Sequence, residues 1–268
     1  MQEIKDKISH ICQNCGSDLS GNYCSNCGQE GKAALNRSVF SLIHHFFEEL
    51  FVWDSRFFRS VKYIFTRPGF LTHEYISGRI VGYISPLKMF LFTSLVLFFI
   101  MIKSDSDQYK ALVTNGGEDD FLREFILEQQ NKSSNSAELF INNFNEQFND
   151  NITIYIFIIM FLFSILLKII YITKNYYYSE HIVFTLHFFT FVLWSFLAGV
   201  IAQDLGEIFV ILFLYIVPAV YLLIAVKRVY HKTFLPAVLS SAFMTISYWV
   251  LISIWMIGTV FLSAYRAA

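Results

Sequence analysis

The chain of 268 residues has few charged side chains, because Asp, Glu, Lys and Arg make up only 15% of it. Soluble domains carry about 25%. Hydrophobic residues make up 55% of the chain, Phe alone occurs 30 times, and the mean hydropathy is +0.50. This balance argues against a soluble enzyme and against a disordered chain. The formal net charge of −1 gives no electrostatic indication by its sum alone.

Several functional motifs are also missing from the sequence. It contains no Gly-x-Ser-x-Gly, no phosphate-binding Gly-rich loop and no His-Glu-x-x-His. The first residues, MQEIKDKISH, lack the apolar region of a signal peptide, so we expect the first membrane span to direct insertion. The missing catalytic motifs favour a protein without catalytic activity.

Five apolar stretches are each long enough to cross a bilayer, which takes about 20 residues. They cover residues 84–102, 152–172, 182–202, 208–226 and 234–265. A buried helix of a soluble protein explains any one of them, but five in one short chain predict an all-α polytopic membrane protein with about five transmembrane helices. None of the five contains Asp or Glu, which argues against an ion-coupled transporter.

The distribution of Lys and Arg predicts the orientation. Residues 1–88 carry ten basic side chains, whereas residues 103–150 carry four against ten acidic ones. Basic residues near a span favour the cytosolic side. We therefore expect the N-terminus in the cytosol, the C-terminus outside, and an acidic extracytoplasmic loop at 103–150. Two weak helical patterns in that loop fit either a small helical hairpin or a flexible tether.

All four cysteines lie near the N-terminus, in two Cys-x-x-Cys-Gly pairs. The two-residue spacer lets both thiolates of a pair reach one ion, and the following Gly allows the backbone to turn. Four thiolates close a tetrahedral shell, which predicts a miniature structural zinc ribbon, with Tyr23 packing on a very small core. Two disulfides, or rubredoxin-like iron, are the alternatives, and disulfides require an oxidising compartment. The predicted zinc ligands are Cys12, Cys15, Cys24 and Cys27.

The ribbon segment has no basic surface. Residues 10–31 contain no Lys or Arg, whereas binding to nucleic acid depends on such side chains. The sequence therefore favours contact with another protein, or capping of the terminus, over binding of nucleic acid.

An amphipathic helix is predicted for residues 38–65, because apolar residues recur there at spacings of three and four. It suits a helix lying among lipid headgroups, or one docked on the cytosolic ends of the membrane helices; both remain open. The pattern His44-His45-x-x-Glu48-Glu49 offers metal ligands. A solvated polar face is favoured, since consecutive residues point about 100° apart around a helix.

A motif follows this helix and leads into the first span. Arg67 and Arg79 within it suit phospholipid headgroups or acidic groups of a partner, and Arg79 and Tyr83 fit interfacial anchors. Together with the cysteine pairs, this motif gives the set Cys12, Cys15, Gly16, Cys24, Cys27, Gly28, Gln29, Arg67, Pro68, Gly69, Tyr75, Ile76, Gly78, Arg79, Tyr83 and Pro86. In these residues the chain resembles the DUF3667 family of uncharacterised bacterial integral membrane proteins with an N-terminal zinc ribbon. The resemblance covers about residues 12–100 and implies a location in the bacterial cytoplasmic membrane, but no activity.

His187 falls inside the third apolar stretch. An ionisable residue within a membrane helix is a functional hypothesis by default. A neutral His bonded to Ser, Thr or Tyr of a neighbouring helix is nevertheless commoner than a proton relay.

Three regions result: a cytosolic zinc ribbon and linker at 1–36, the amphipathic helix and motif at 37–83, and the transmembrane bundle at 84–268. The function we expect is that of a non-catalytic scaffold or accessory subunit of a membrane protein complex. Its partners would be the lipid bilayer and other membrane proteins or further copies of the chain. The alternative is a channel, lipid-handling protein or transporter with a cavity near His187, and an intramembrane enzyme comes third. The sequence does not identify a substrate.

Overall fold

The computed structural model describes residues 11–31, 56–103, 108–114, 121–202, 205–231 and 233–268. Part of the amphipathic helix predicted for 38–65 lies outside these residues, as does its cluster of His44, His45, Glu48 and Glu49. Within the described residues the regular elements are helices, and the ribbon contains two isolated β-bridges. The prediction of an all-α protein is therefore confirmed.

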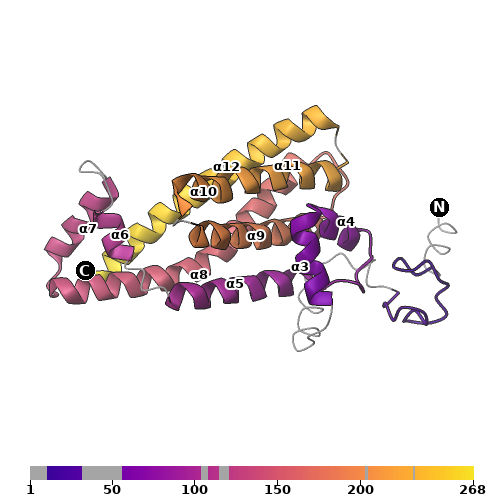
Figure 1. The fold of residues 1–268 in the computed structure, drawn as a ribbon, viewed down its shortest axis with the longest axis horizontal. Helices are drawn as coiled ribbons and strands as arrows, with labels where there is room; N and C mark the ends of the chain where they lie inside the picture. Colours follow the sequence, from indigo (N-terminus) through magenta and orange to yellow (C-terminus); the bar gives the residue numbers. More distant parts are fainter. Residues whose placement is uncertain (1–10, 32–55, 104–107, 115–120, 203–204, 232) are drawn as a thin grey trace. The chain divides into compact units, whose positions relative to one another are not determined.

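Figure 1 shows the helices of the described residues. In chain order they are α3 (Arg56–Thr66), α4 (Phe70–Ile76), α5 (Pro86–Lys103), α6 (Gln108–Thr114), α7 (Phe121–Lys132), α8 (Ala137–Ile170), α9 (Tyr178–Ile201), α10 (Glu207–Ile211), the π-helical turn η2 (Leu212–Ile216), α11 (Val217–Val229) and α12 (Phe234–Ala267). They form two compact units. The first joins the described residues up to Leu95 with Ser164–Thr245, and the second joins Val96–Phe163 with Ile246–Ala268.

Among the described residues, three helical segments are long and apolar enough to cross a membrane: Tyr178–Ile201, Ile208–Val229 and Phe234–Ala267. Two shorter apolar stretches, Pro86–Ile100 and Phe157–Ile170, lie in α5 and α8. These five segments fall where the hydropathy of the sequence places spans. The number of spans and the orientation remain predictions.

The first unit is built around α9, which packs against α4, η2 and α11. Small side chains on α9 let the π turn approach it closely. The hydroxyl of Ser195 donates a hydrogen bond to the carbonyl of Phe213, and a Cβ added at Gly199 would meet the Cβ of Phe213 at 3.4 Å. Close packing at small residues is typical of helices in membranes.

The second unit has its own apolar core, formed by α6, α7, α8 and α12. Tyr109 packs edge-on against Phe140 and Phe144, and its hydroxyl donates a hydrogen bond of 2.6 Å to Gln130. Its backbone N–H donates to the side-chain oxygen of Asn145 at 2.9 Å. Of the two possibilities for residues 103–150, the described part has the helical one, because α6, α7 and the first half of α8 lie there.

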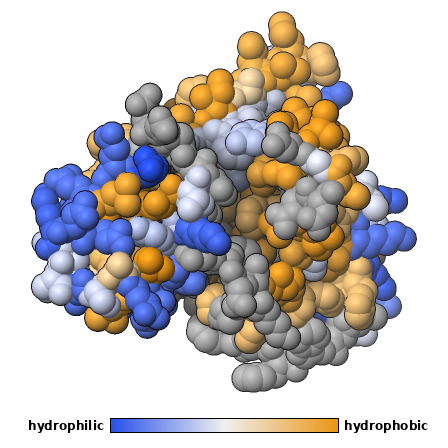
Figure 2. Space-filling model, turned by 60° about the vertical axis from the view of Figure 1, so that its left-hand side comes forward, coloured by the Kyte–Doolittle hydropathy of each residue, from blue (hydrophilic) through white to orange (hydrophobic). Residues whose placement is uncertain are grey.

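The α12 helix exposes an apolar stripe at spacings of three and four. The stripe spans 22 residue steps, which is about 33 Å of helix and close to the roughly 30 Å of the bilayer's hydrocarbon core. Hydrophobic side chains likewise gather into broad patches on the face shown in Figure 2. In contrast, α9 is mostly enclosed by protein. The exposed members of the stripe are Leu235, Leu239, Phe243, Ile246, Val250, Ile254 and Ile257.

Candidate functional site

The ribbon consists of two turns with the same hydrogen bonds. In the first, Gly16 N–H donates to the carbonyl of Cys12 at 2.8 Å, and Cys12 N–H donates to Ser17 at 2.8 Å. In the second, Gly28 and Cys24 make the equivalent bonds. Both glycines have a positive φ, 76° and 74°, which L side chains rarely adopt. The Gly after each Cys-x-x-Cys is therefore required by the backbone.

These turns bring the four thiols together. The Sγ atoms of Cys12 and Cys27 are 3.5 Å apart, as are those of Cys15 and Cys24, and all four lie within 4.8 Å of one another. A tetrahedral ion with metal–sulfur bonds of about 2.3 Å has sulfur–sulfur edges of roughly 3.8 Å. The four cysteines are therefore placed to hold a metal ion, and four protein ligands leave no open position for catalysis.

The small core of the ribbon differs from the prediction. Leu19, not Tyr23, packs against the buried cysteines. Leu19 is 9% exposed, whereas Tyr23 is 65% exposed. The prediction that Tyr23 packs on the core was wrong. Tyr23, directly before Cys24, is exposed, and so is Ile11, directly before Cys12.

The thiols of this cluster ionise unequally in the absence of a metal. Hydrogen bonds from Ser17 lower the pKa of Cys15 to about 6, whereas desolvation raises the pKa of Cys27 to about 11. A bound cation needs all four as thiolates, so its binding releases protons and is weakened by acid.

Gln29 connects the ribbon to the motif segment, by which we mean residues 67–83. Its side chain is 4% exposed, and its Nε2 donates a hydrogen bond of 2.7 Å to the carbonyl of Gly78, 49 residues away. The backbone N–H of Ile80 lies 3.5 Å from the Gln29 Oε1. The side chain therefore holds the backbone of the motif segment on either side of Arg79.

Gly78 ends α4 in a Schellman motif. Its own N–H bonds the carbonyl of Tyr75 at 3.0 Å, and the N–H of Arg79 bonds that of Glu74 at 2.9 Å. Gly78 has φ 80°, the left-handed conformation that this helix end uses and that Gly adopts without a steric penalty. This end of the helix directs the carbonyl of Gly78 toward the ribbon.

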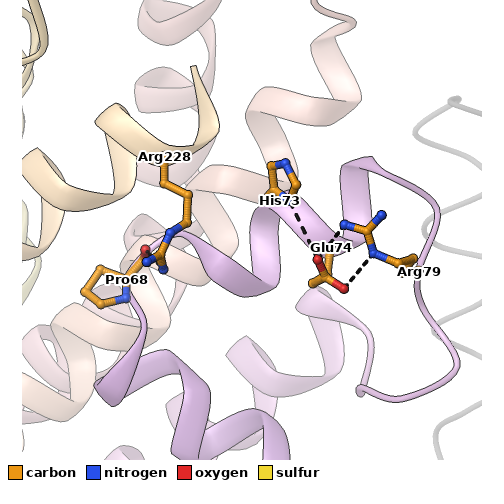
Figure 3. Close-up of polar contacts among 5 residues, drawn as sticks. All are labelled: Pro68, His73, Glu74, Arg79 and Arg228. Carbon is orange, nitrogen blue, oxygen red and sulfur yellow. Dashed lines mark hydrogen bonds and ion pairs between the residues drawn. The ribbon is translucent and has the colours of Figure 1, made fainter. Parts of the chain in front are cut away.

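Gly69 fixes the other end of the motif segment against α11. It has φ 74°, and a Cβ built on it would lie 2.8 Å from the Cα of Ala225. Beside it, Arg228 donates a hydrogen bond of 2.7 Å from Nη1 to the carbonyl of Pro68 (Figure 3). The Pro68-Gly69 pair therefore marks a close contact between the motif segment and a membrane-type helix.

Arg79 is held by Glu74 in a two-pronged ion pair, with N–O distances of 2.7 and 2.6 Å (Figure 3). His73 Nδ1 lies 3.6 Å from the same carboxylate. The hydrogen bonds from Arg79 hold the pKa of Glu74 below its ordinary value. The positive charge of Arg79 is thus compensated within α4 and its end.

Arg67 lies in a different environment. Its guanidinium carbon is 5.0 Å from the ring centre of Tyr63 and 5.4 Å from that of Phe70. The ring of Tyr83 contacts both of these rings edge-on. Pro86 begins α5, where its missing N–H breaks no helical bond.

His187 bonds a neighbouring helix. Its Nδ1 is 2.9 Å from the hydroxyl of Thr72 in α4, and both side chains are buried. A bond to a hydroxyl of a neighbouring helix is the contact that the sequence favours for His187, and the choice between a structural role and a proton relay remains a prediction. Phe184 and Phe188, close to His187 in α9, are also buried.

Residues 54–98 match the family model described as "Protein of unknown function (DUF3667)". The matched residues include α3, α4, most of α5 and the whole motif segment, and the match supports the resemblance found from the motifs. A search of curated proteins and a search of solved structures found no match.

Sequence reasoning missed the partners of these motif residues. Glu74, Thr72 and Arg228 are unremarkable in the sequence, yet they hold Arg79, His187 and Pro68. The five-residue spacing between Glu74 and Arg79 was the one local signal available. The other two partners lie more than 100 residues from the groups they contact.

Proposed function

We propose that this protein is a non-catalytic scaffold or accessory subunit of a membrane protein complex, and that it is a DUF3667 protein of the bacterial cytoplasmic membrane. The observation that carries the proposal is the buried hydrogen bond from Gln29 to Gly78. It connects a metal-type ribbon, which has no open coordination position, to a segment packed on α9 and α11. In this proposal the ribbon and the motif segment fix each other's position, and neither takes part in a reaction.

The metal we propose is zinc, in a structural role. Four thiolates are soft ligands that suit a tetrahedral zinc ion, and the ribbon has only Leu19 and its cysteines as a core. Metal binding would therefore supply the folding free energy of this module. The ligands would be Cys12, Cys15, Cys24 and Cys27.

We further propose five transmembrane helices, with the N-terminus in the cytosol and the C-terminus outside. The apolar stretches of α5 and α8 support the first two spans, and the three longer segments support the others. The concentration of Lys and Arg in residues 1–88 supports the orientation.

Tyr23 is our candidate for the contact with a protein partner. It is 65% exposed, it lies directly before the metal ligand Cys24, and the ribbon around it carries no basic residue. An exposed aromatic side chain on a rigid module is typical of residues that contribute strongly to protein interfaces.

The channel, lipid-handling or transporter function is the less supported alternative. It requires a polar, water-accessible cavity near His187. The bond of His187 to Thr72 and the buried phenylalanines of α9 leave no observation in favour of it on the described residues.

Affinity purification of the full chain from native membranes tests the scaffold. We expect proteins that co-purify with the wild type to be lost with Tyr23→Ser and with Cys24→Ser, and retained with the matched control Ser25→Ala, which changes an exposed residue between two ligands. Purification of the wild type as a lone, unpartnered monomer would contradict the proposal.

The Gln29→Ala variant tests the connection itself, because it keeps all four cysteines. We expect an unchanged zinc content and partner binding weakened about fivefold, the effect of losing one hydrogen bond worth roughly 1 kcal/mol. Unchanged partner binding would show that the ribbon acts independently of the motif segment.

A further inference from the structure

The two arginines of the motif segment differ in their partners. Arg79 is paired with Glu74. Within the part of the chain that the structure describes, Arg67 has no carboxylate partner, and its contacts are the faces of Tyr63 and Phe70. A guanidinium that contacts aromatic rings still offers a fork of N–H donors that suits a planar, two-pronged acceptor.

Arg59, eight residues before Arg67, provides a second guanidinium. Arg59 and Tyr63 are four residues apart on α3. Arg67 follows the end of α3, and its N–H still donates to the carbonyl of Tyr63 at 3.0 Å, so the three residues follow one stripe. A Cβ added at Gly82 would lie 3.7 Å from Nη1 of Arg59. Arg59 therefore lies over the backbone that leads into Tyr83, and no carboxylate among the described residues contacts it.

Tyr83 directly follows Gly82, beside Arg59, and its ring contacts the rings of Tyr63 and Phe70, over which Arg67 lies. Burial raises the pKa of Tyr83, and the charges of Glu74 and Tyr63 act in the same direction, whereas the charges of Arg59 and Arg67 act against them. The two guanidinium groups and the phenols of Tyr63 and Tyr83 therefore belong to one cluster around these rings. Each of these four groups can donate a hydrogen bond, as a site for an anion requires, and the nearby carboxylate of Glu74 is engaged by Arg79.

The location indicates where the anion comes from. Tyr83 lies three residues before Pro86, where the apolar helix α5 begins. On the outer side of α3, Phe58 is 77% exposed and Phe65 is 44% exposed. Aromatic side chains next to cations, just before a span, are typical of the headgroup region of a bilayer.

We propose that Arg59 and Arg67, held around the ring cluster of Tyr63, Phe70 and Tyr83, bind the phosphate group of an anionic phospholipid. The site rests on the proposed function only in that α5 crosses the bilayer. It is independent of the ribbon and of any protein partner. Arg79 takes no part in it, because Glu74 already compensates its charge.

Native mass spectrometry of the purified full chain tests the site, with phosphatidylglycerol and phosphatidylcholine of identical acyl chains as the probes. We expect the wild type to retain phosphatidylglycerol in preference. Because hydrogen bonds to charged groups contribute roughly 1.5 kcal/mol or more, Arg59→Gln and Arg67→Gln should each lower this retention about tenfold.

Arg67→Lys and Lys62→Gln separate a specific site from a general attraction. The first keeps the charge but loses the planar, stacked geometry, and we expect it to bind as weakly as Arg67→Gln. The second removes one exposed charge from α3 outside the stripe, and we expect near wild-type retention. The proposal is overturned if Arg67→Lys binds like the wild type while Lys62→Gln binds like Arg67→Gln.

Inorganic phosphate separates the two possible sources of the anion. Displacement of phosphatidylglycerol by a comparable concentration of inorganic phosphate would identify a soluble phosphate as the ligand and overturn the lipid assignment. Loss of protein partners with Cys24→Ser, without loss of the lipid, would show that the phospholipid site is independent of the scaffold function. Each variant should unfold at the same temperature as the wild type, which checks that the fold is retained.

Discussion

The ribbon of residues 11–31 and the motif segment of residues 67–83 are similar in length, but different interactions hold them. The ribbon has a core of one leucine and its cysteines, so we expect its fold to depend on a metal. The motif segment has a close backbone contact at Gly69, a Schellman end at Gly78 and an ion pair at Arg79. We therefore expect removal of the metal to unfold the whole ribbon. In the motif segment, loss of any one contact should lower the stability only by what that contact contributes.

The largest expected effect is on the ribbon, from Cys24→Ser or from removal of the metal by a chelator. Binding of zinc to such a module contributes about 10–16 kcal/mol at neutral pH, far more than a core of this size supplies. We therefore expect residues 11–31 to unfold while α4 keeps its structure. Hydrogen exchange measured by mass spectrometry, segment by segment, checks both halves of the prediction.

The matched control for this experiment is Ser25→Ala, which leaves the four thiols in place. Exchange in residues 11–31 that does not change on chelation would contradict the dependence on a metal. Equal loss of protection in α4 would show that the two regions fold as one and would remove the contrast.

The second effect is on the motif segment, from Gly69→Ala. The left-handed conformation costs a non-glycine residue about 1–2 kcal/mol, and the added methyl group meets Ala225 at 2.8 Å, an overpacking that costs roughly 1–3 kcal/mol. We expect exchange in α4 to rise by tenfold or more while the ribbon keeps its metal. The measurement is again segment-resolved exchange, together with zinc content.

Gly258→Ala provides the comparison, since a Cβ at Gly258 meets nothing within 4 Å. It should leave α4 unchanged. Exchange in α4 that is the same for Gly69→Ala and Gly258→Ala would mean that the contact with α11 does not hold the segment.

The smallest effect is expected from Glu74→Gln, which removes the partner of Arg79. A partly exposed ion pair contributes at most about 1 kcal/mol, and the Arg79 side chain is 37% exposed. Because the pKa of Glu74 is lowered in the fold, its contribution is present above the pKa of the unfolded state, about 4.3. It is lost as the pH falls through the lower folded value.

The difference in exchange between wild type and Glu74→Gln, measured at each pH, should therefore be present near neutral pH and vanish in acid. Glu128→Gln removes an exposed pair with Lys132 in α7 and should not affect α4 at any pH. A difference that persists unchanged below the folded pKa of Glu74 would contradict this role for the ion pair.

Much of the architecture could be predicted from the sequence, because its signals are local and periodic. The spacing of the cysteines brought the four thiols together as expected, and the apolar stretches became helices at nearly the predicted residues. The core of the ribbon could not be predicted in the same way. Tyr23 and Leu19 are both apolar, and only the direction of the turn decides which one is buried.

The roles of the two motif arginines also depended on the fold. Both suited lipid headgroups by sequence, but Glu74 compensates Arg79, whereas Arg67 stacks on aromatic rings. The rings of Tyr63 and Phe70 lie on opposite sides of a helix break in the sequence. Their approach to each other therefore follows from how α3 and α4 pack.

The sequence by itself determined the cluster of four cysteines, the helical class and the apolar segments, because each depends on residues that are neighbours in the chain. Tertiary structure alone decided that Gln29 bonds Gly78, that His187 bonds Thr72, and that Gly69 has no room for a side chain. The first two contacts join groups 49 and 115 residues apart, and the third depends on α11. No local pattern encodes such pairs, since they exist only once the chain has folded.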